Sequence, residues 1–191
     1  MKSRKNTGGL SWAAFKAEWR GWLDEKAPML IFGCKFGGLI LLLYLVLALP
    51  AGDRLLYGYL KANAWVANGL LGLTGQQTHL ADEVVIQSSR FSMGVRRGCD
   101  AVEPTWLVCA AMIAFPVPWR KKIVGMAAAV LTLQVLNLVR LVTLYFIGAY
   151  LPAFFDSAHL EIWPTVFILA AITLFLFWKN VPSNQARPRN S

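Results

Sequence analysis

Residues 118–151 read PWRKKIVGMAAAVLTLQVLNLVRLVTLYFIGAYL, a basic turn followed by a long apolar run that contains one arginine, Arg140. A run of this length can cross the hydrocarbon core of a bilayer as a single helix. The charged turn indicates its orientation, because short loops rich in Lys and Arg remain on the cytoplasmic side. We therefore expect a membrane span at residues 123–149 that begins at the cytoplasmic face.

The composition of the chain agrees with a membrane protein. Of its 191 residues 57% are hydrophobic and only 15% are charged, which is too apolar for an ordinary soluble domain. The net charge of +9 is explained by membrane orientation, so no nucleic-acid partner is expected. The three cysteines, Cys34, Cys99 and Cys109, have no metal-ligand spacing, and we expect neither a metal nor a cofactor.

The hydropathy pattern predicts an all-α polytopic membrane protein with four transmembrane helices. We expect a single membrane-embedded domain at 29–178, between an amphipathic cytoplasmic segment at 1–28 and a basic cytoplasmic tail at 179–191. Within the domain we predict spans at 29–49, 101–118, 123–149 and 160–178, an outer interfacial or re-entrant helix at 55–73, and a small outer hairpin in the region 76–98.

Charge placement supports this topology. Basic residues concentrate in the N-terminal segment, the turn at 120–122 and the tail, whereas most acids lie in the segments that this arrangement puts outside. Both termini are then cytoplasmic. We expect the protein to lie in the inner membrane of the cell. The run 55–73 cannot cross once, because the spans before and after it both meet the outer face.

Three reactive side chains fall at one depth. With a rise of 1.5 Å per residue, each lies about 30 Å from the basic cytoplasmic end of its span: Cys99, Arg140 and His159. Nucleophilic catalysis needs a thiolate, a proton carrier for the leaving amine and a donor for the oxyanion, and these three residues supply one role each. Redox exchange between Cys99 and Cys109 is excluded, since ten residues of helix separate them by roughly 15 Å.

Other residues are expected to support this group. Arg96, Arg97 and the helix start after Cys99 should lower the pKa of the thiol or bind the backbone of a substrate. Asp156, one turn before His159, is placed to orient the imidazole.

Plainer roles remain open for the same residues. Arg140 needs a partner in an apolar run, and a structural pair with Glu103 or Asp156 would satisfy it. Asp100 or Glu103 is placed to cap the following helix, and His159 alone could be an interfacial residue.

The segment Gly98-Cys99-Asp100-Ala101-Val102-Glu103, the Asn-x-x-Arg at 137–140 and His159-Leu160-Glu161-Ile162-Trp163 together resemble the exosortase/archaeosortase family of membrane cysteine transpeptidases. The stretch 110–119 is most similar to the exosortase H branch. Many members place Ser-Gly after the cysteine, where this chain has Asp100-Ala101. The resemblance implies that Cys99, Arg140 and His159 are catalytic, and we expect Asn137 to support Arg140.

The resemblance also implies the substrates. They would be secreted proteins with a C-terminal sorting signal, made of a short motif, a transmembrane helix and a basic tail, and for the H branch the motif is of the Ile-Pro-Thr-Leu type. An unidentified acceptor nucleophile would release the product from a thioester. Two other functions stay open, a non-enzymatic membrane assembly partner and, less favoured, a small oligomeric transporter.

Overall fold

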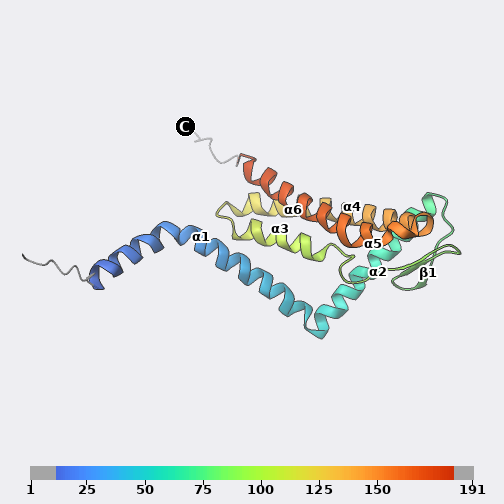
Figure 1. The fold of residues 1–191 in the computed structure, drawn as a ribbon, viewed down its shortest axis with the longest axis horizontal. Coiled ribbons are helices and arrows are strands. Elements are labelled where there is room, and N and C mark those ends of the chain that lie inside the picture. The colour runs from blue at the N-terminus through green and yellow to red at the C-terminus, as the bar shows by residue number, and fades with distance from the viewer. Residues whose placement is uncertain (1–11, 183–191) are drawn as a thin grey trace, which may run out of the picture.

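The computed structural model describes residues 12–182, and most of them are helical (Figure 1). The elements are α1 (Trp12–Leu47), α2 (Pro50–Leu73), β1 (His79–Asp82), β2 (Val85–Gln87), β3 (Ser92–Gly94), α3 (Val102–Ala114), α4 (Trp119–Tyr150), the 3-10 turn η1 (Pro152–Phe154), α5 (Phe155–Ser157), the π-helix η2 (Ala158–Ile162) and α6 (Trp163–Asn180). Predictions for residues 1–11 and 183–191 lie outside the described residues.

The helices α3, α4 and α6 lie side by side as a bundle, and α1 packs against α3 (Figure 1). Three helical segments are long and apolar enough to cross a membrane: 18–47, 119–150 and 152–180. The helix α3 has only 13 residues, a rise of roughly 20 Å, so length alone does not make it a fourth span. The chain is thus a helical membrane protein with three candidate spans and one shorter apolar helix.

The first helix corrects the prediction that Pro28 separates a surface helix from a span. Pro28 lies inside α1, which continues through it for 36 residues. The helix changes direction in its first half (Figure 1), as expected near an internal proline, which removes one backbone hydrogen bond. The amphipathic segment and the first span are therefore two arms of one bent helix.

The boundaries between the next helices also differ from the prediction. The expected span 101–118 ends at Ala114, because Pro116 disfavours helical backbone at the preceding Phe115. The basic residues expected in the turn, Arg120 to Lys122, instead lie in the first turn of α4, which begins at Trp119. The connection between the two helices is therefore the apolar segment 115–118.

Two of these basic residues also donate hydrogen bonds to the C-terminal ends of neighbouring helices. Lys122 Nζ donates to the carbonyl of Ile113 near the end of α3, and Lys121 Nζ donates to the carbonyls of Lys179 (3.1 Å) and Val181 (2.6 Å) at the end of α6. The last carbonyls of a helix have no partner within it and carry the negative end of its dipole. The cations of α4 thus hold three helix ends together.

The helix α2 begins at Pro50, five residues before the predicted start, because proline is favoured at the first helical position. Its buried residues recur every three or four positions, which makes one continuous face: Leu56, Leu60, Asn63, Ala64, Ala67 and Leu71. This face contacts α4, β1 and β2. One face of the helix α2 therefore forms part of the hydrophobic core.

The region 76–98 contains three strands, not the predicted two. The expected hairpin is present as β2 and β3, with Ile86 opposite Met93, and β1 adds to it with His79 opposite Gln87. The order in the sheet is β1-β2-β3, all antiparallel. The sheet lies at the end of the bundle where α5 lies (Figure 1).

Two aromatic contacts anchor the sheet to α4. Tyr145, fully buried, donates its hydroxyl to Ser88 Oγ (2.8 Å) in the turn between β2 and β3. Phe91 packs edge-on against Tyr145 and Phe155, and its ring occupies the space where a Cβ on Gly148 would lie. The strand β3 is thereby held at a fixed place beside α4.

The opposite end of the bundle depends on a similar glycine contact, which gives a test of the packing. A Cβ on Gly125 would overlap Nε1 of Trp178, whereas a Cβ on Gly69 meets nothing within 4 Å. We expect Gly125→Ala to destabilise the protein by about 1–3 kcal/mol through overpacking. Gly69→Ala should stabilise it by up to about 1 kcal/mol through helix propensity. Thermal unfolding of both variants in detergent measures this, and equal shifts would contradict the packing of Trp178 on Gly125.

Candidate active site

Cys99 and His159 come together from segments sixty residues apart. The Sγ of Cys99 lies 3.0 Å from Nε2 of His159, which is hydrogen-bond distance for a thiol. Cys99 is in a tight turn before α3, closed by its own N–H donating to the carbonyl of Arg96 (2.9 Å), and the preceding Gly98 has a left-handed backbone with φ of +86°. The thiol is 8% exposed.

His159 lies in the π-helix η2, at the start of the long C-terminal helix. A π-helix holds one more residue per turn than the α-helix on each side, and such insertions are frequent at functional sites. The imidazole that contacts Cys99 is carried within this insertion. Phe155, one turn earlier, packs its ring against the imidazole with 5.6 Å between the centroids.

Arg140 is the third member of the group. Its Nη1 donates to the carbonyl of Gly98 (3.0 Å), which links α4 directly to the turn that carries Cys99. Arg140 is 4% exposed, and its guanidinium lies 5.7 Å from the ring centroid of Phe167. Among residues 12–182 it forms no salt bridge, so the expected pair with Glu103 or Asp156 is absent. A full positive charge is therefore available beside the thiol.

The segment after Cys99 begins α3 in an unusual way. The N-cap position is Ala101 and not Asp100, but Asp100 Oδ1 accepts from the N–H of Val102 (3.1 Å), the first residue of α3. Ala101 has a left-handed backbone with φ of 55°, a conformation that glycine adopts at least cost. The Ser-Gly that many family members have at this point would meet that requirement without strain.

A buried polar network behind the turn was not foreseen. The Tyr59 hydroxyl donates to the carbonyl of Asp100 (2.8 Å) and contacts the side-chain oxygen of Gln134. Asn63 then accepts from Gln134 Nε2 (2.5 Å) and from Asn137 Nδ2 (3.2 Å). The network joins α2 and α4 to the backbone beside Cys99 and thereby holds that turn in place.

The two reactive side chains open into a pocket of about 260 Å³. Its walls are β3, Phe91, Leu144 and Phe155, with Cys99 and His159 on one side. Among the described residues no group of three or more His, Cys, Asp or Glu is placed to hold a metal ion. The arrangement of thiol, imidazole and buried guanidinium suits covalent acyl transfer.

A family model described as a transmembrane exosortase, of the EpsH type, matches residues 29–178. The chain belongs to the exosortase family. Neither a curated protein nor a solved structure matches it. The resemblance drawn from Cys99, Arg140 and His159 is thus confirmed at the level of the family.

In this exosortase the supporting residues lie differently from the prediction. Asn137 is fully buried and donates to Asn63, but no hydrogen bond joins it to Arg140. Asp156 is exposed and has no hydrogen bond to His159, so Phe155 and not Asp156 contacts the imidazole.

Three charged residues close to Cys99 in the sequence lie at the surface, whereas Cys99 itself is buried. Arg96, Arg97 and Glu103 are exposed. Arg97 pairs with Asp53 and donates to the carbonyl of Leu47 (3.3 Å), which ties the turn to the junction of α1 and α2.

The pKa of Cys99 also differs from the expectation. Burial raises the pKa of the thiol, and the charge of Arg140 and the backbone of Arg96 lower it by less. Asp100 contributes a smaller rise. Arg96 lowers the pKa of the thiol through a backbone hydrogen bond, and the burial of the thiol outweighs this effect. The resting group is a neutral thiol, which needs a base to become a nucleophile.

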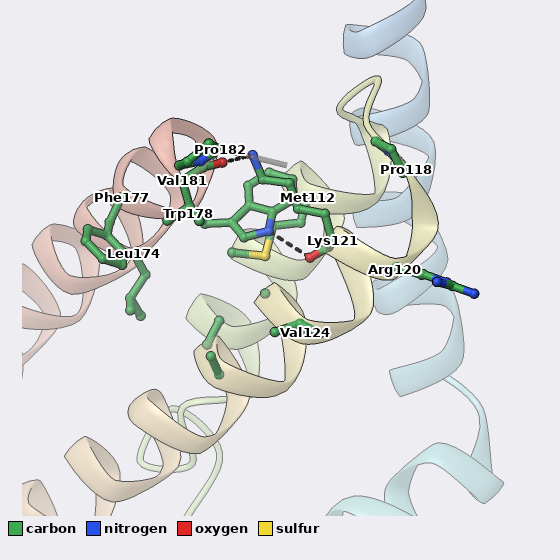
Figure 2. Close-up of a pocket in the computed structure, with 13 residues that line it drawn as sticks. Met112, Pro118, Arg120, Lys121, Val124, Leu174, Phe177, Trp178, Val181 and Pro182 are labelled. Atoms are coloured by element: carbon green, nitrogen blue, oxygen red, sulfur yellow. Dashed lines mark hydrogen bonds between the residues drawn. The ribbon is translucent and has the colours of Figure 1, made fainter. Parts of the chain in front are cut away.

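A larger pocket, of about 570 Å³, lies at the other end of the bundle between α4 and α6 (Figure 2). Trp178 forms its centre, with Nε1 donating to the carbonyl of Lys121 (2.9 Å), and Figure 2 shows Arg120 directed away from it. Its lining includes no Cys, His or carboxylate. Among the described residues, the groups suited to acyl transfer therefore line the smaller pocket and not this one.

The raised pKa of Cys99 predicts how its reactivity depends on pH. Only the thiolate is alkylated, so the rate should increase with pH with a midpoint above that of free cysteine, about 8.5. The positive charge of Arg140 stabilises the thiolate, so its removal in Arg140→Gln should move the midpoint higher. Arg140→Lys keeps the charge and should move the midpoint less. Mass spectrometry of alkylation in a variant without Cys34 and Cys109 measures this. A midpoint below that of free cysteine would contradict it.

The left-handed backbone at Ala101 predicts opposite effects of two substitutions. A non-glycine residue there costs about 1–3 kcal/mol, and a β-branched side chain lies at the unfavourable end. Ala101→Gly should therefore leave the thermal unfolding temperature unchanged or raise it. Ala101→Val should lower it clearly. Similar unfolding temperatures for the two variants would exclude a positive φ at this residue.

Proposed function

We propose that this exosortase is a membrane-embedded cysteine transpeptidase that cleaves the C-terminal sorting signal of secreted proteins. The observation that carries the proposal is the 3.0 Å distance between Cys99 Sγ and His159 Nε2, with the buried charge of Arg140 held beside the same turn. Three separate segments supply these groups. A bundle of apolar helices does not need them for its packing, so their convergence points to a function.

The first step forms a thioester. His159 Nε2 takes the thiol proton as Sγ of Cys99 attacks the carbonyl carbon of the scissile peptide bond. Negative charge develops on the carbonyl oxygen, and Arg140 stabilises it in a site that excludes most water. The C–N bond then breaks, and the leaving amine takes the proton from His159.

The second step releases the acyl group. An acceptor amine attacks the thioester carbonyl, His159 removes the proton from that amine, and the thiolate leaves and is reprotonated. Water can take the place of the amine, and the product is then a free carboxylate. Because the resting thiol is neutral, His159 acts first as a base, so no preformed ion pair is required.

The proposed topology matches the substrate. We infer that α1, α3, α4 and α6 cross the inner membrane with both termini cytoplasmic, and that the pocket of Cys99 lies at the periplasmic face. This orientation is supported by the charges of α4. Arg120 and Lys121 lie at its first turn, and Arg140 lies about 28 Å farther along the helix. The transmembrane helix of a substrate would then align its motif with the pocket and leave its basic tail inside.

Loss of the nucleophile tests the proposal. The probe is a secreted reporter that ends in an Ile-Pro-Thr-Leu motif, an apolar helix and a basic tail. Cys99→Ala should reduce its cleavage by roughly 10⁴-fold or more, because no other thiol lies beside His159. Immunoblotting of the reporter and trapping of the thioester by mass spectrometry measure the change.

Matched cysteine variants control for general effects of thiol loss. Cys34→Ala and Cys109→Ala should cleave the reporter as the unmodified chain does, since both residues lie in helices away from the pocket. Normal cleavage by Cys99→Ala would exclude the nucleophile assignment and favour a non-enzymatic membrane partner.

A further inference from the structure

The free edge of β3 presents backbone groups of known direction. In an antiparallel pair, every second residue exchanges hydrogen bonds with its partner strand. Ser88 N–H donates to the carbonyl of Phe91 (2.9 Å) and Val95 N–H donates to that of Val84 (2.7 Å), which fixes the alternation. Met93 therefore bonds to β2, whereas the N–H and C=O groups of Ser92 and Gly94 point away from β2.

The residues that carry these outward groups also line the pocket of the reactive side chains. Ser92 and Gly94 line the same cavity of about 260 Å³ as Cys99 and His159. Among residues 12–182 the structure shows no hydrogen-bond partner for the outward groups. Edge strands with unpaired groups are templates for another strand, and this edge lies beside a nucleophile.

The chemistry requires an extended substrate at this point. In a helix the carbonyl of each residue is hydrogen-bonded and surrounded by its own chain, so a thiol cannot reach the carbonyl carbon. The scissile segment must therefore leave the helical conformation before it reaches Cys99. An extended segment in turn has unpaired N–H and C=O groups, which need partners in a site that excludes water.

We propose that the sorting motif binds as an additional β-strand on the free edge of β3, through the backbone N–H and C=O groups of Ser92 and Gly94. The proposal rests on the proposed function and adds how the substrate is held. Strand addition takes its affinity from main-chain hydrogen bonds, and side-chain pockets then select the sequence. Phe155 and Leu144, on the walls of the cavity, provide apolar contacts for alternate side chains of the motif.

The position of β3 supports this use. Tyr145 holds the turn at Ser88, and Phe91 is packed into the space above Gly148. The edge is thus rigid and requires no ordering when a peptide binds. A Cβ on Gly94 would meet only the flexible side chain of Arg96, at 3.4 Å, so the strand leaves room for a neighbouring backbone.

A proline substitution on the enzyme tests the pairing. Ser92→Pro removes an outward N–H and places a ring where the new strand would lie, but leaves the hydrogen bonds to β2 in place. We expect kcat/KM for the reporter to fall at least about tenfold, chiefly through KM. The matched control is Gln77→Pro, in an exposed loop before β1, which should cleave at the normal rate.

Alkylation of Cys99 by a small reagent checks that the Ser92→Pro variant is folded, because that reaction needs no strand pairing. A normal alkylation rate with a tenfold loss of cleavage supports the proposal. Cleavage by Ser92→Pro at the normal rate overturns it. Failure of the proposed function is a separate result, since the unmodified chain and Cys99→Ala would then cleave the reporter equally.

N-methylation of the substrate backbone gives an independent test. Proline has no N–H, so the proline of a synthetic Ile-Pro-Thr-Leu peptide must lie where the strand points away from β3. Methylation of the Thr nitrogen, which then points toward β3, should reduce thioester formation at Cys99 about tenfold. Methylation of the Leu nitrogen should have a much smaller effect. Equal effects at the two positions would exclude strand addition.

Discussion

Arg140 carries a full positive charge within an apolar helix, where only 4% of its surface is exposed. Such a charge is costly in a bilayer unless protein groups replace its water. The carbonyl of Gly98 and the ring of Phe167 lie against it from two other segments, and no carboxylate within residues 12–182 forms a salt bridge with it. The need to solvate this one guanidinium fixes the turn of Cys99 against α4, and the geometry of the pocket follows from that attachment.

The convergence of the site was predictable because helix geometry is regular. A constant rise per residue places Cys99, Arg140 and His159 at one depth without knowledge of any contact. The same regularity does not determine which way a side chain points. The expected hydrogen bonds of Asn137 to Arg140 and of Asp156 to His159 are absent, although a spacing of three residues puts each pair on one face of a helix. Asn137 donates to Asn63 instead, and Asp156 is exposed.

Other features were missed for separate physical reasons. Pro28 suggested a helix boundary, but a proline inside a long helix produces a bend when the rest of the helix supplies enough hydrogen bonds. The strand β1 has only four residues and an irregular burial pattern, so it carries no alternation to detect. The sequence gives no sign that Asn63 and Gln134 belong together, because they lie in separate apolar runs and meet only when α2 and α4 pack against each other.

The π-helix at residues 158–162 sets the phase between the imidazole and the helix that follows. An α-helix turns by about 100° per residue, so the one extra residue in this turn rotates everything after it relative to His159. Loss of a single codon here would restore an ordinary helix. The face of α6 that carries Phe167 and Trp178 could then meet the bundle only if the imidazole swung away from the sulfur. The single inserted residue therefore allows the C-terminal helix to pack Phe167 and Trp178 on the bundle and to hold His159 against Cys99.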